Sequence, residues 1–289
     1  MQVIGVIGAG LMGNGIAHVA ALAGYDVILS DVAMARVEAA KATIAANLAR
    51  GVKKGTVDAG AVEPALARIA LTTDTARFAM ADLVIEAATE NESVKAQIFA
   101  DLCPRLKPDA LLATNTSSIS ITRLAAATDR PDRFSGVHFF NPVPLMALVE
   151  IIRGLATSDA TADAMHAFAA RLGKTSIAAG DAPAFIVNRV LCPMMNEAIF
   201  ALDEGVGSVA DIDAGLRLGA NHPMGPLTLA DYVGLDTLLS IMRIMQEATG
   251  DPKYRPAPLL VKYVEAGWFG RKTRRGFYDY TGAEPVPTR

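Results

Sequence analysis

The first thirty-one residues constrain the fold more than any other part of the chain. The apolar, β-branched run at residues 3–7 predicts a buried strand. It leads directly into the glycine-rich run GAGLMG at residues 8–13 and then into a helical stretch at 14–24. A second strand at residues 26–30 ends on Asp31. The order strand, glycine-rich turn, helix and strand is typical of the first unit of a doubly wound α/β sheet.

The glycines of this turn have distinct physical roles. Gly8 permits a tight turn, Gly10 lets the backbone approach a pyrophosphate, and Gly13 lets the helix pack closely on the strand. The free N–H groups at the helix N-terminus attract the same phosphates. An ordinary βα turn is the alternative, but the flanking elements are in the register that the motif requires. We therefore expect a dinucleotide to be bound by Gly8, Ala9, Gly10, Leu11, Met12 and Gly13.

Asp31 indicates which dinucleotide is bound. It lies 18 residues beyond Gly13, where a carboxylate can accept hydrogen bonds from the adenosine ribose. The same carboxylate would repel a 2′-phosphate, which favours NAD over NADP. Arg36 follows closely enough in the sequence to keep NADP open as the alternative.

Length and composition limit the class of protein. A chain of 289 residues suggests two domains, and a composition that is 52% hydrophobic and 20% charged supplies a large core. The net charge of −3 argues against nucleic acid as a partner. Cys103 and Cys192 match neither a disulfide framework nor a metal site, which favours a reducing cytoplasm. Residues 1–25 carry no charged side chain, but their glycines mark turns rather than a signal or membrane segment.

The rest of the chain divides into two parts. Further strands are predicted at 69–72, 82–87, 111–114, 134–140, 148–152 and 175–178, with helices at 33–51, 59–68, 95–106, 119–126 and 159–172. After a linker at 180–183, only helices are predicted, at 185–204, 208–218, 226–232 and 235–249. We therefore expect a Rossmann-type α/β domain over residues 1–183 and an all-helical domain over 184–289, whose apolar faces would support a homodimer.

The most specific chemical prediction concerns His138 and Glu150. Glu150 lies within an aliphatic strand, where a buried carboxylate is costly unless it is paired. His138 precedes it by twelve residues, across a turn. A carboxylate that orients an imidazole also makes it a stronger base, so the two residues are predicted to form a catalytic pair. The alternative is a core histidine and a surface glutamate. The other histidines, His18, His166 and His222, are interpreted as structural.

Polar residues also follow two predicted strands. Thr89, Glu90 and Asn91 come after one strand, and the run from Asn115 to Ser118 comes after the next. Ligands of open α/β sheets bind at such carboxyl ends. We expect Ser117 to lie in the site and Ser118 to cap the following helix. The pair Lys53–Lys54 is either solvated or placed to bind phosphates of a substrate.

Six sequence blocks together resemble the short-chain L-3-hydroxyacyl-CoA dehydrogenases, especially the bacterial 3-hydroxybutyryl-CoA dehydrogenases. The resemblance runs nearly from end to end. The blocks are GAGLMGNGIA (8–17), ATNTSSISI (113–121), HFFNPVPLMALVEII (138–152), FIVNR (185–189), NHPMGPLTLADYVGLD (221–236) and GRKTRRGFYDY (270–280). The family fold, a nucleotide domain followed by a helical dimerisation domain, agrees with the predicted organisation.

The resemblance implies roles for individual residues. His138 would be the general base and Glu150 its partner, while Ser117 and Asn188 would hold the 3-oxygen of the substrate. Residues implied to line the nicotinamide and its ribose are Glu90, Lys95, Asn115 and Asn141, with Lys272 approaching from the C-terminal region. Asn47 and Lys54 fall where the family contacts coenzyme A.

Three positions depart from the family pattern. Ala184 stands where a glycine is expected, Ala147 where a lysine is common, and Arg274 where the family often has glycine. None of them belongs to the proposed pair. We expect Ala184 to affect the interdomain hinge, and the other two to affect acyl or coenzyme preference.

The resemblance implies reversible, NAD-linked oxidation of a short-chain (3S)-3-hydroxyacyl-CoA, such as 3-hydroxybutyryl-CoA, to the 3-oxoacyl-CoA in fatty acid metabolism. The reaction requires no metal. One alternative is a dehydrogenase of a hydroxyacid without coenzyme A, such as L-gulonate. Another is a crystallin-like NAD-binding protein without turnover, against which the intact His138–Glu150 pair argues.

Overall fold

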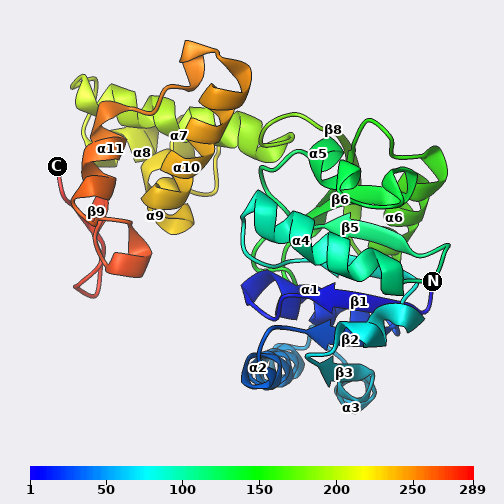
Figure 1. Cartoon of the computed structure of the whole chain (residues 1–289). Coiled ribbons are helices and arrows are strands. Elements are labelled where there is room, and N and C mark those ends of the chain that lie inside the picture. The colour runs from blue at the N-terminus through cyan, green and yellow to red at the C-terminus, as the bar shows by residue number, and fades with distance from the viewer. The chain divides into compact units, whose positions relative to one another are not determined.

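The computed structural model describes all 289 residues. The chain divides into two compact units, Met1–Phe185 and Ile186–Arg289 (Figure 1). The sequence places this boundary two residues earlier, after residue 183. None of the helices combines the length and the apolar character that a membrane crossing requires.

The first unit is built on one eight-stranded sheet. Its strands are β1 (Val3–Ile7), β2 (Asp26–Ser30), β3 (Ile69–Thr72), β4 (Leu83–Glu86), β5 (Leu111–Thr114), β6 (Phe134–Phe139), β7 (Leu148–Arg153) and β8 (Thr175–Gly180). They lie in the order β3-β2-β1-β4-β5-β6-β7-β8, and every neighbouring pair is parallel except β6 and β7. The chain runs from β1 outward in one direction and returns to continue from β4 in the other. The order therefore reverses between β1 and β4, which is where doubly wound sheets bind ligands.

Helices cover both faces of this sheet. They are α1 (Leu11–Leu22), α2 (Met34–Lys53), α3 (Ala59–Ala67), α4 (Glu92–Leu102), α5 (Ile121–Ala126) and α6 (Asp159–Arg171) (Figure 1). Side chains that alternate along each strand enter two separate cores, as the pleat of a strand requires. Ile85 of β4 packs in the core that contains α1, α2 and α6, and Val84 packs in the core that contains α4 and α5.

Helices α1, α4 and α5 begin two or three residues away from their predicted starts, α1 at Leu11 rather than residue 14. Helix α4 begins at Glu92 rather than Lys95, because the Asn91 side chain caps it by accepting a hydrogen bond from the Val94 amide. Helix α5 begins at Ile121 rather than 119. Asp181, from the predicted linker, accepts hydrogen bonds from the Ile121 and Thr122 amides and so fixes this start.

The second unit is mainly helical, as predicted. Its helices are α7 (Val187–Asp203), α8 (Val209–Ala214), α9 (Pro226–Val233), α10 (Leu235–Thr249) and α11 (Pro258–Glu265). The prediction of an all-helical domain is incomplete, because α11 was not anticipated and a two-stranded sheet, β9 (Tyr278–Asp279) and β10 (Val286–Pro287), follows it. These strands have two residues each, which is too short for a periodic pattern to reveal.

A buried carboxylate organises the end of the second unit. Asp231 of α9 is 1% exposed and accepts hydrogen bonds from the Phe277 amide, the Tyr278 amide and the Tyr280 hydroxyl. A Cβ on Gly276 would lie 1.9 Å from Asp231 Oδ1, so only glycine fits there. Burial raises the pKa of Asp231 to about 6, although the hydrogen bonds from Tyr278 and Phe277 act in the opposite direction.

Candidate active site

The glycine-rich turn has the geometry that a phosphate site requires. Gly8 has a φ of 98°, and a Cβ on Gly13 would lie 1.7 Å from the Gly8 carbonyl oxygen. Around Gly10, by contrast, a Cβ would meet nothing within 4 Å. Helix α1 begins directly afterwards, and no side chain caps its first amides. These amides are therefore available to an anion in the open space beside Gly10.

A cavity of about 550 Å³ runs along this turn in the first unit. Its lining extends from Asp31 and Arg36, beyond β2, past Gly8 and Gly10 to the end of β4. It therefore spans the position where the strand order reverses. A cavity of this size and place suits a dinucleotide.

The Asp31 carboxylate is held at one end of the cavity. Its Oδ2 accepts a hydrogen bond from the Ala9 amide at 2.8 Å, and its Oδ1 accepts one from the Val32 amide at 2.8 Å. Arg36 also donates to Oδ1, at 3.3 Å, from a side chain that is 68% exposed. The carboxylate is thus fixed to the glycine-rich turn, and the guanidinium lies on its solvent side.

His138 and Glu150 are brought together by the antiparallel pairing of β6 with β7. The two residues are direct partners in the strand register, so their side chains leave the sheet on the same face. The Nδ1 atom of His138 lies 2.7 Å from Oε2 of Glu150. Glu150 is fully buried and His138 is 6% exposed. With Nδ1 engaged by the carboxylate, Nε2 is the ring nitrogen left for proton exchange. The predicted contact is confirmed, and its role in the chemistry stays a prediction.

Aromatic rings and an asparagine support this histidine. The His138 ring lies 4.6 Å from that of Phe140 and 5.7 Å from that of Phe185, measured between centroids. Asn115, at the end of β5, accepts a hydrogen bond from the Phe139 amide at 2.9 Å. Asn115 therefore fixes the strand beside the histidine. Asn141 lies exposed after β6, in a cis peptide bond with Pro142.

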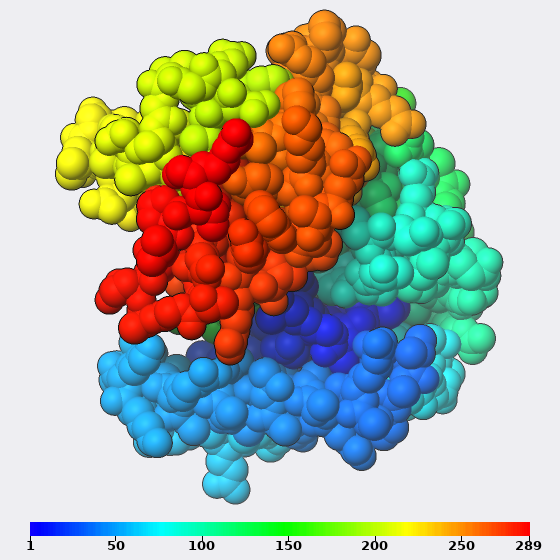
Figure 2. All heavy atoms as spheres, turned by 90° about the vertical axis from the view of Figure 1, so that its left-hand side faces the viewer, coloured from blue at the N-terminus to red at the C-terminus, as the bar shows by residue number.

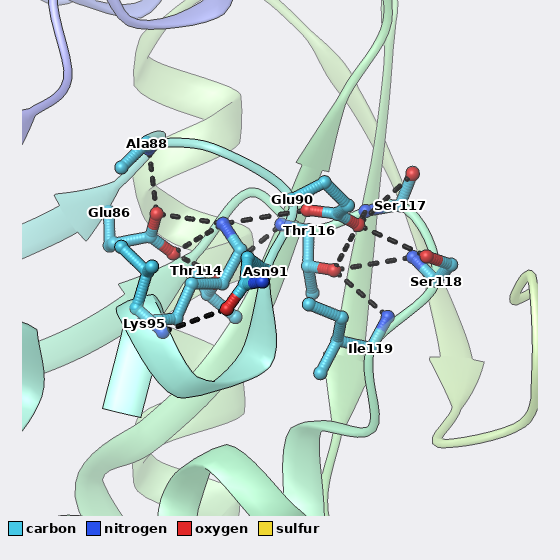
Figure 3. A network of polar contacts seen from close by, with 11 residues as sticks. Glu86, Ala88, Glu90, Asn91, Lys95, Thr114, Thr116, Ser117, Ser118 and Ile119 are labelled. Atoms are coloured by element: carbon cyan, nitrogen blue, oxygen red, sulfur yellow. Dashed lines mark hydrogen bonds and ion pairs between the residues drawn. The ribbon is translucent and has the colours of Figure 1, made fainter. Parts of the chain in front are cut away.

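Glu90 holds the polar loop that follows β5 (Figure 3). Its Oε1 accepts hydrogen bonds from Thr116 Oγ1 at 2.5 Å, from the Ser117 amide at 2.9 Å and from Ser118 Oγ at 3.1 Å. Burial acts to raise the pKa of Glu90, but Lys95 and these hydrogen bonds outweigh it and lower the pKa. Glu90 is therefore ionised at neutral pH.

This arrangement corrects the prediction for Ser118. The cap of α5 is Ser120, whose side chain accepts a hydrogen bond from the Arg123 amide. Ser118 instead donates to Glu90. The helix starts later than expected because Asp181 binds its first amides, which leaves Ser118 in the loop. Ser117 is half-buried in the same loop, with its Oγ 3.2 Å from Glu90 Oε1.

The Lys95 ammonium is buried between two carboxylates. It lies 2.7 and 2.8 Å from the two oxygens of Glu86 and 3.5 Å from Oε2 of Glu90 (Figure 3). Lys95 is 1% exposed, and Glu86 is fully buried. Direct contact of Lys95 with a coenzyme stays a prediction, because in this structure its ammonium is bound to carboxylates.

Glu86 was not singled out from the sequence. It ends the strand β4 among aliphatic residues, which is the same sequence signal that identified Glu150. Its Oε1 also accepts a hydrogen bond from the Ala88 amide at 2.6 Å, and its Oε2 accepts one from Thr114 Oγ1 at 2.7 Å. Both of its oxygens are therefore fully used within the protein.

The residues expected to meet coenzyme A lie on and just beyond α2. Asn47 is half-buried and accepts a hydrogen bond from Arg50. Lys53, at the end of the helix, and Lys54, which follows it, are exposed. Figure 2 shows a side of the molecule on which the outer face of this helix, in blue, is visible along its length. Contact between these residues and a ligand stays a prediction.

Two expected site residues belong to the second unit. Asn188 lies in the first turn of α7 and is half-buried. Lys272 is exposed and pairs with Asp236, with 2.5 Å between Nζ and Oδ1. Their roles toward a ligand stay predictions.

His18 and His166 have environments that suit a structural role, and the structural role of His222 stays a prediction. His18 is 4% exposed within α1, and burial lowers its pKa to about 4, with the Lys174 charge contributing. The Nδ1 atom of His166 lies 2.8 Å from Oγ of Ser176.

Comparison with known proteins finds the same relatives for both units. Residues 3–182 match the family model described as 3-hydroxyacyl-CoA dehydrogenase, NAD binding domain, and residues 185–280 match the one described as 3-hydroxyacyl-CoA dehydrogenase, C-terminal domain. The chain is 64% identical to a 3-hydroxybutyryl-CoA dehydrogenase of Bradyrhizobium diazoefficiens, over 99% of this chain and 98% of that one. It is 51% identical to a probable 3-hydroxybutyryl-CoA dehydrogenase of Deinococcus radiodurans, over 96% and 99%.

A solved structure agrees with these matches. The crystal structure of (S)-3-hydroxybutyryl-CoA dehydrogenase from Ralstonia eutropha superimposes with a TM-score of 0.95 at 49% identity, covering 98% of this chain and all of that one.

Proposed function

Because the chain belongs to the 3-hydroxyacyl-CoA dehydrogenase family, we propose that it catalyses the reversible, NAD-linked oxidation of a (3S)-3-hydroxyacyl-CoA to the 3-oxoacyl-CoA. The names of its relatives support 3-hydroxybutyryl-CoA as the substrate. The observation that carries the proposal is the buried His138–Glu150 pair, in the same unit as the glycine-rich turn.

The residues present suit a dinucleotide coenzyme. Gly8, Ala9, Gly10, Leu11, Met12 and Gly13 would hold its pyrophosphate at the start of α1, with Asp31 on the adenosine ribose. Asp31 also supports NAD over NADP, because its charge repels a 2′-phosphate. Glu90, Asn115 and Asn141 would line the nicotinamide side, with Lys95 and Lys272 as further family positions. A bound nicotinamide ring supplies the acceptor for the hydride that leaves C3 of the substrate.

The proton is handled by the protein. In the oxidative direction Nε2 of His138 accepts the proton of the 3-hydroxyl group. The Glu150 carboxylate, 2.7 Å from Nδ1, stabilises the imidazolium that results. In the reductive direction the same nitrogen returns the proton to the 3-oxygen. Ser117 and Asn188 would hold that oxygen by hydrogen bonds and so position the carbon for reaction.

The remaining parts of the proposal concern partners and setting. Asn47 and Lys54 would contact coenzyme A, whose phosphates suit the exposed cations at the end of α2. The exposed apolar side chains of the second unit, such as Val190 and Leu218, support a homodimer. The buried, free thiols of Cys103 and Cys192 support a reducing, cytoplasmic setting.

The test is NADH consumption with acetoacetyl-CoA, for the wild type and His138→Gln. We expect rapid turnover by the wild type and a loss of about 10²–10⁴-fold in the variant, because a positioned acid–base contributes that much. NADPH and free acetoacetate serve as controls for coenzyme and substrate. If the wild type binds NADH but ignores acetoacetyl-CoA, the substrate is wrong, and L-gulonate and longer acyl chains are tested next.

A further inference from the structure

The Glu86, Lys95 and Glu90 side chains form a group of charges that is not balanced. Two carboxylates face one ammonium, so the group carries a net charge of −1 when all three are ionised. The ammonium is not shared equally. It lies within 2.8 Å of both Glu86 oxygens but 3.5 Å from the nearer Glu90 oxygen. Lys95 therefore compensates mainly Glu86 and interacts with Glu90 from a greater distance, so most of the excess negative charge falls on Glu90 (Figure 3).

Glu90 is also the member of the group that reaches solvent. Its side chain is 38% exposed, whereas those of Lys95 and Glu86 are 1% and 0% exposed. Its Oε1 is fixed by the loop from Thr116 to Ser118. The excess charge is thus held in a defined position at the carboxyl end of the sheet.

The cavity of the first unit reaches residues beside this group. Ala88, Thr89 and Val94 line the cavity, and each is bonded to, or adjacent in the chain to, one of the charged residues. The Ala88 amide donates to Glu86, and Thr89 and Val94 precede Glu90 and Lys95 in the chain. A dinucleotide with its adenosine ribose at Asp31 and its pyrophosphate at Gly10 would extend its second nucleotide toward this end.

We propose that Glu86 is a positioning residue that holds the Lys95 ammonium away from Glu90. Because Glu86 binds this ammonium with both oxygens, the negative charge of Glu90 is left largely uncompensated. The site therefore favours the oxidised, positively charged nicotinamide over the reduced, neutral one. The inference rests on the proposed function, since it needs a nicotinamide coenzyme in this cavity. A unit charge near the ring changes the relative affinity for the two forms, because only one form is charged.

Glu86→Gln tests the proposal with little change in shape. The amide oxygen can keep the Ala88 contact and the amide nitrogen can donate to Thr114 Oγ1. That nitrogen cannot accept from Lys95, so the ammonium keeps only a neutral oxygen acceptor at residue 86 and its charge is compensated by Glu90 instead. We expect the ratio Kd(NAD⁺)/Kd(NADH) of the complete chain to rise on the order of three- to tenfold. Binding is measured by calorimetry for both coenzyme forms.

The double variant Glu86→Gln/Lys95→Met separates charge from structure. It removes the ammonium, so Glu90 is again uncompensated and the ratio should return to within about twofold of the wild type. If Glu86 had a purely structural role, the ratio Kd(NAD⁺)/Kd(NADH) of the double variant would differ from the wild-type ratio by more than that of Glu86→Gln does. Glu92→Gln is the control, because this exposed carboxylate of α4 pairs with Arg123 outside the group, and its ratio should not change.

Glu90→Gln keeps the proposal falsifiable if Glu86→Gln does not fold, which thermal denaturation would reveal. It removes the excess charge itself and must raise the ratio in the same direction. The inference is overturned if the ratio Kd(NAD⁺)/Kd(NADH) is unchanged in Glu90→Gln. It is also overturned if the ratio of the double variant equals that of Glu86→Gln. If the wild type binds neither coenzyme form, the proposed function fails instead.

Discussion

Ala184 and Arg274 stand where the sequence resemblance predicts glycine, and both adopt left-handed backbone conformations. Their φ values are 66° and 59°. A residue with a Cβ pays roughly 1–2 kcal/mol for this conformation. At both positions the backbone therefore has a conformation that suits glycine better than the residue present. Ala147, the third departure, is exposed and contributes its carbonyl oxygen to the Thr175 amide, which any residue could do.

We expect Arg274→Gly to stabilise the second unit by roughly 0.5–1 kcal/mol, because it relieves strain at an exposed position. Arg274→Ala is the matched control, since it removes the charge but keeps the Cβ and should bring no gain. Urea denaturation followed by the fluorescence of Trp268, the single tryptophan, reports on this unit. Equal stabilisation by both variants would contradict the explanation. Ala184→Gly should be nearly neutral, because the buried methyl group that it loses offsets the relief.

Glu150→Gln should lower kcat by about 10²–10⁴-fold, because an amide cannot stabilise the imidazolium and can select the wrong tautomer of His138. The measurement is acetoacetyl-CoA reduction beside the Kd for NADH, which should stay within about twofold. A loss smaller than tenfold would mean that the carboxylate serves packing rather than proton transfer.

At the scale of elements, the sequence predicted the long, regular features and missed those set by contacts between distant residues. The strands of the sheet follow from runs of aliphatic residues, and the facing of His138 and Glu150 follows from one costly charge in such a run. The start of α4 depends on the Asn91 cap, and the start of α5 depends on the Asp181 carboxylate that binds its first amides. Asp181 lies sixty residues from the amide of Ile121, so local patterns carry no information about it.

The site was predicted in the same uneven way. The glycine-rich turn and Asp31 belong to one local motif and could be read from spacing alone. Glu86 could have been found by the reasoning applied to Glu150, because it too is an acid at the end of a buried strand. The sharing of Lys95 between Glu86 and Glu90 could not have been predicted from the sequence. It depends on distances of 2.7 and 3.5 Å, which are set by the packing of helix α4.

Asp231 should make the second unit lose stability as pH rises. Burial raises its folded pKa from 3.8 to about 6, so the folded state binds more protons than the unfolded state between these values. Relative to Asp231→Asn, the wild type should therefore lose about 2–3 kcal/mol between pH 4 and pH 7. Urea titrations of both proteins at four pH values, followed by Trp268 fluorescence, measure the difference. Parallel stability curves would show that Asp231 is ionised without cost.

At the scale of the whole molecule, we expect a homodimer. The second unit exposes large apolar side chains, with Val190, Val206 and Leu218 between 70% and 79% exposed. Light scattering at micromolar concentration should give about twice the chain mass of 30.3 kDa. A mass equal to one chain across this range would exclude the dimer.

The antiparallel pairing of β6 with β7 has a consequence for how the His138–Glu150 contact can be lost. Because the two residues lie on neighbouring strands joined by one connection, their contact depends on the register of a single strand pair. A single-residue insertion in one strand between the turn and its partner residue would turn that residue to the opposite face of the sheet and break the contact. A register shift of one residue within this hairpin is therefore enough to separate His138 from Glu150 while both residue types remain in the sequence.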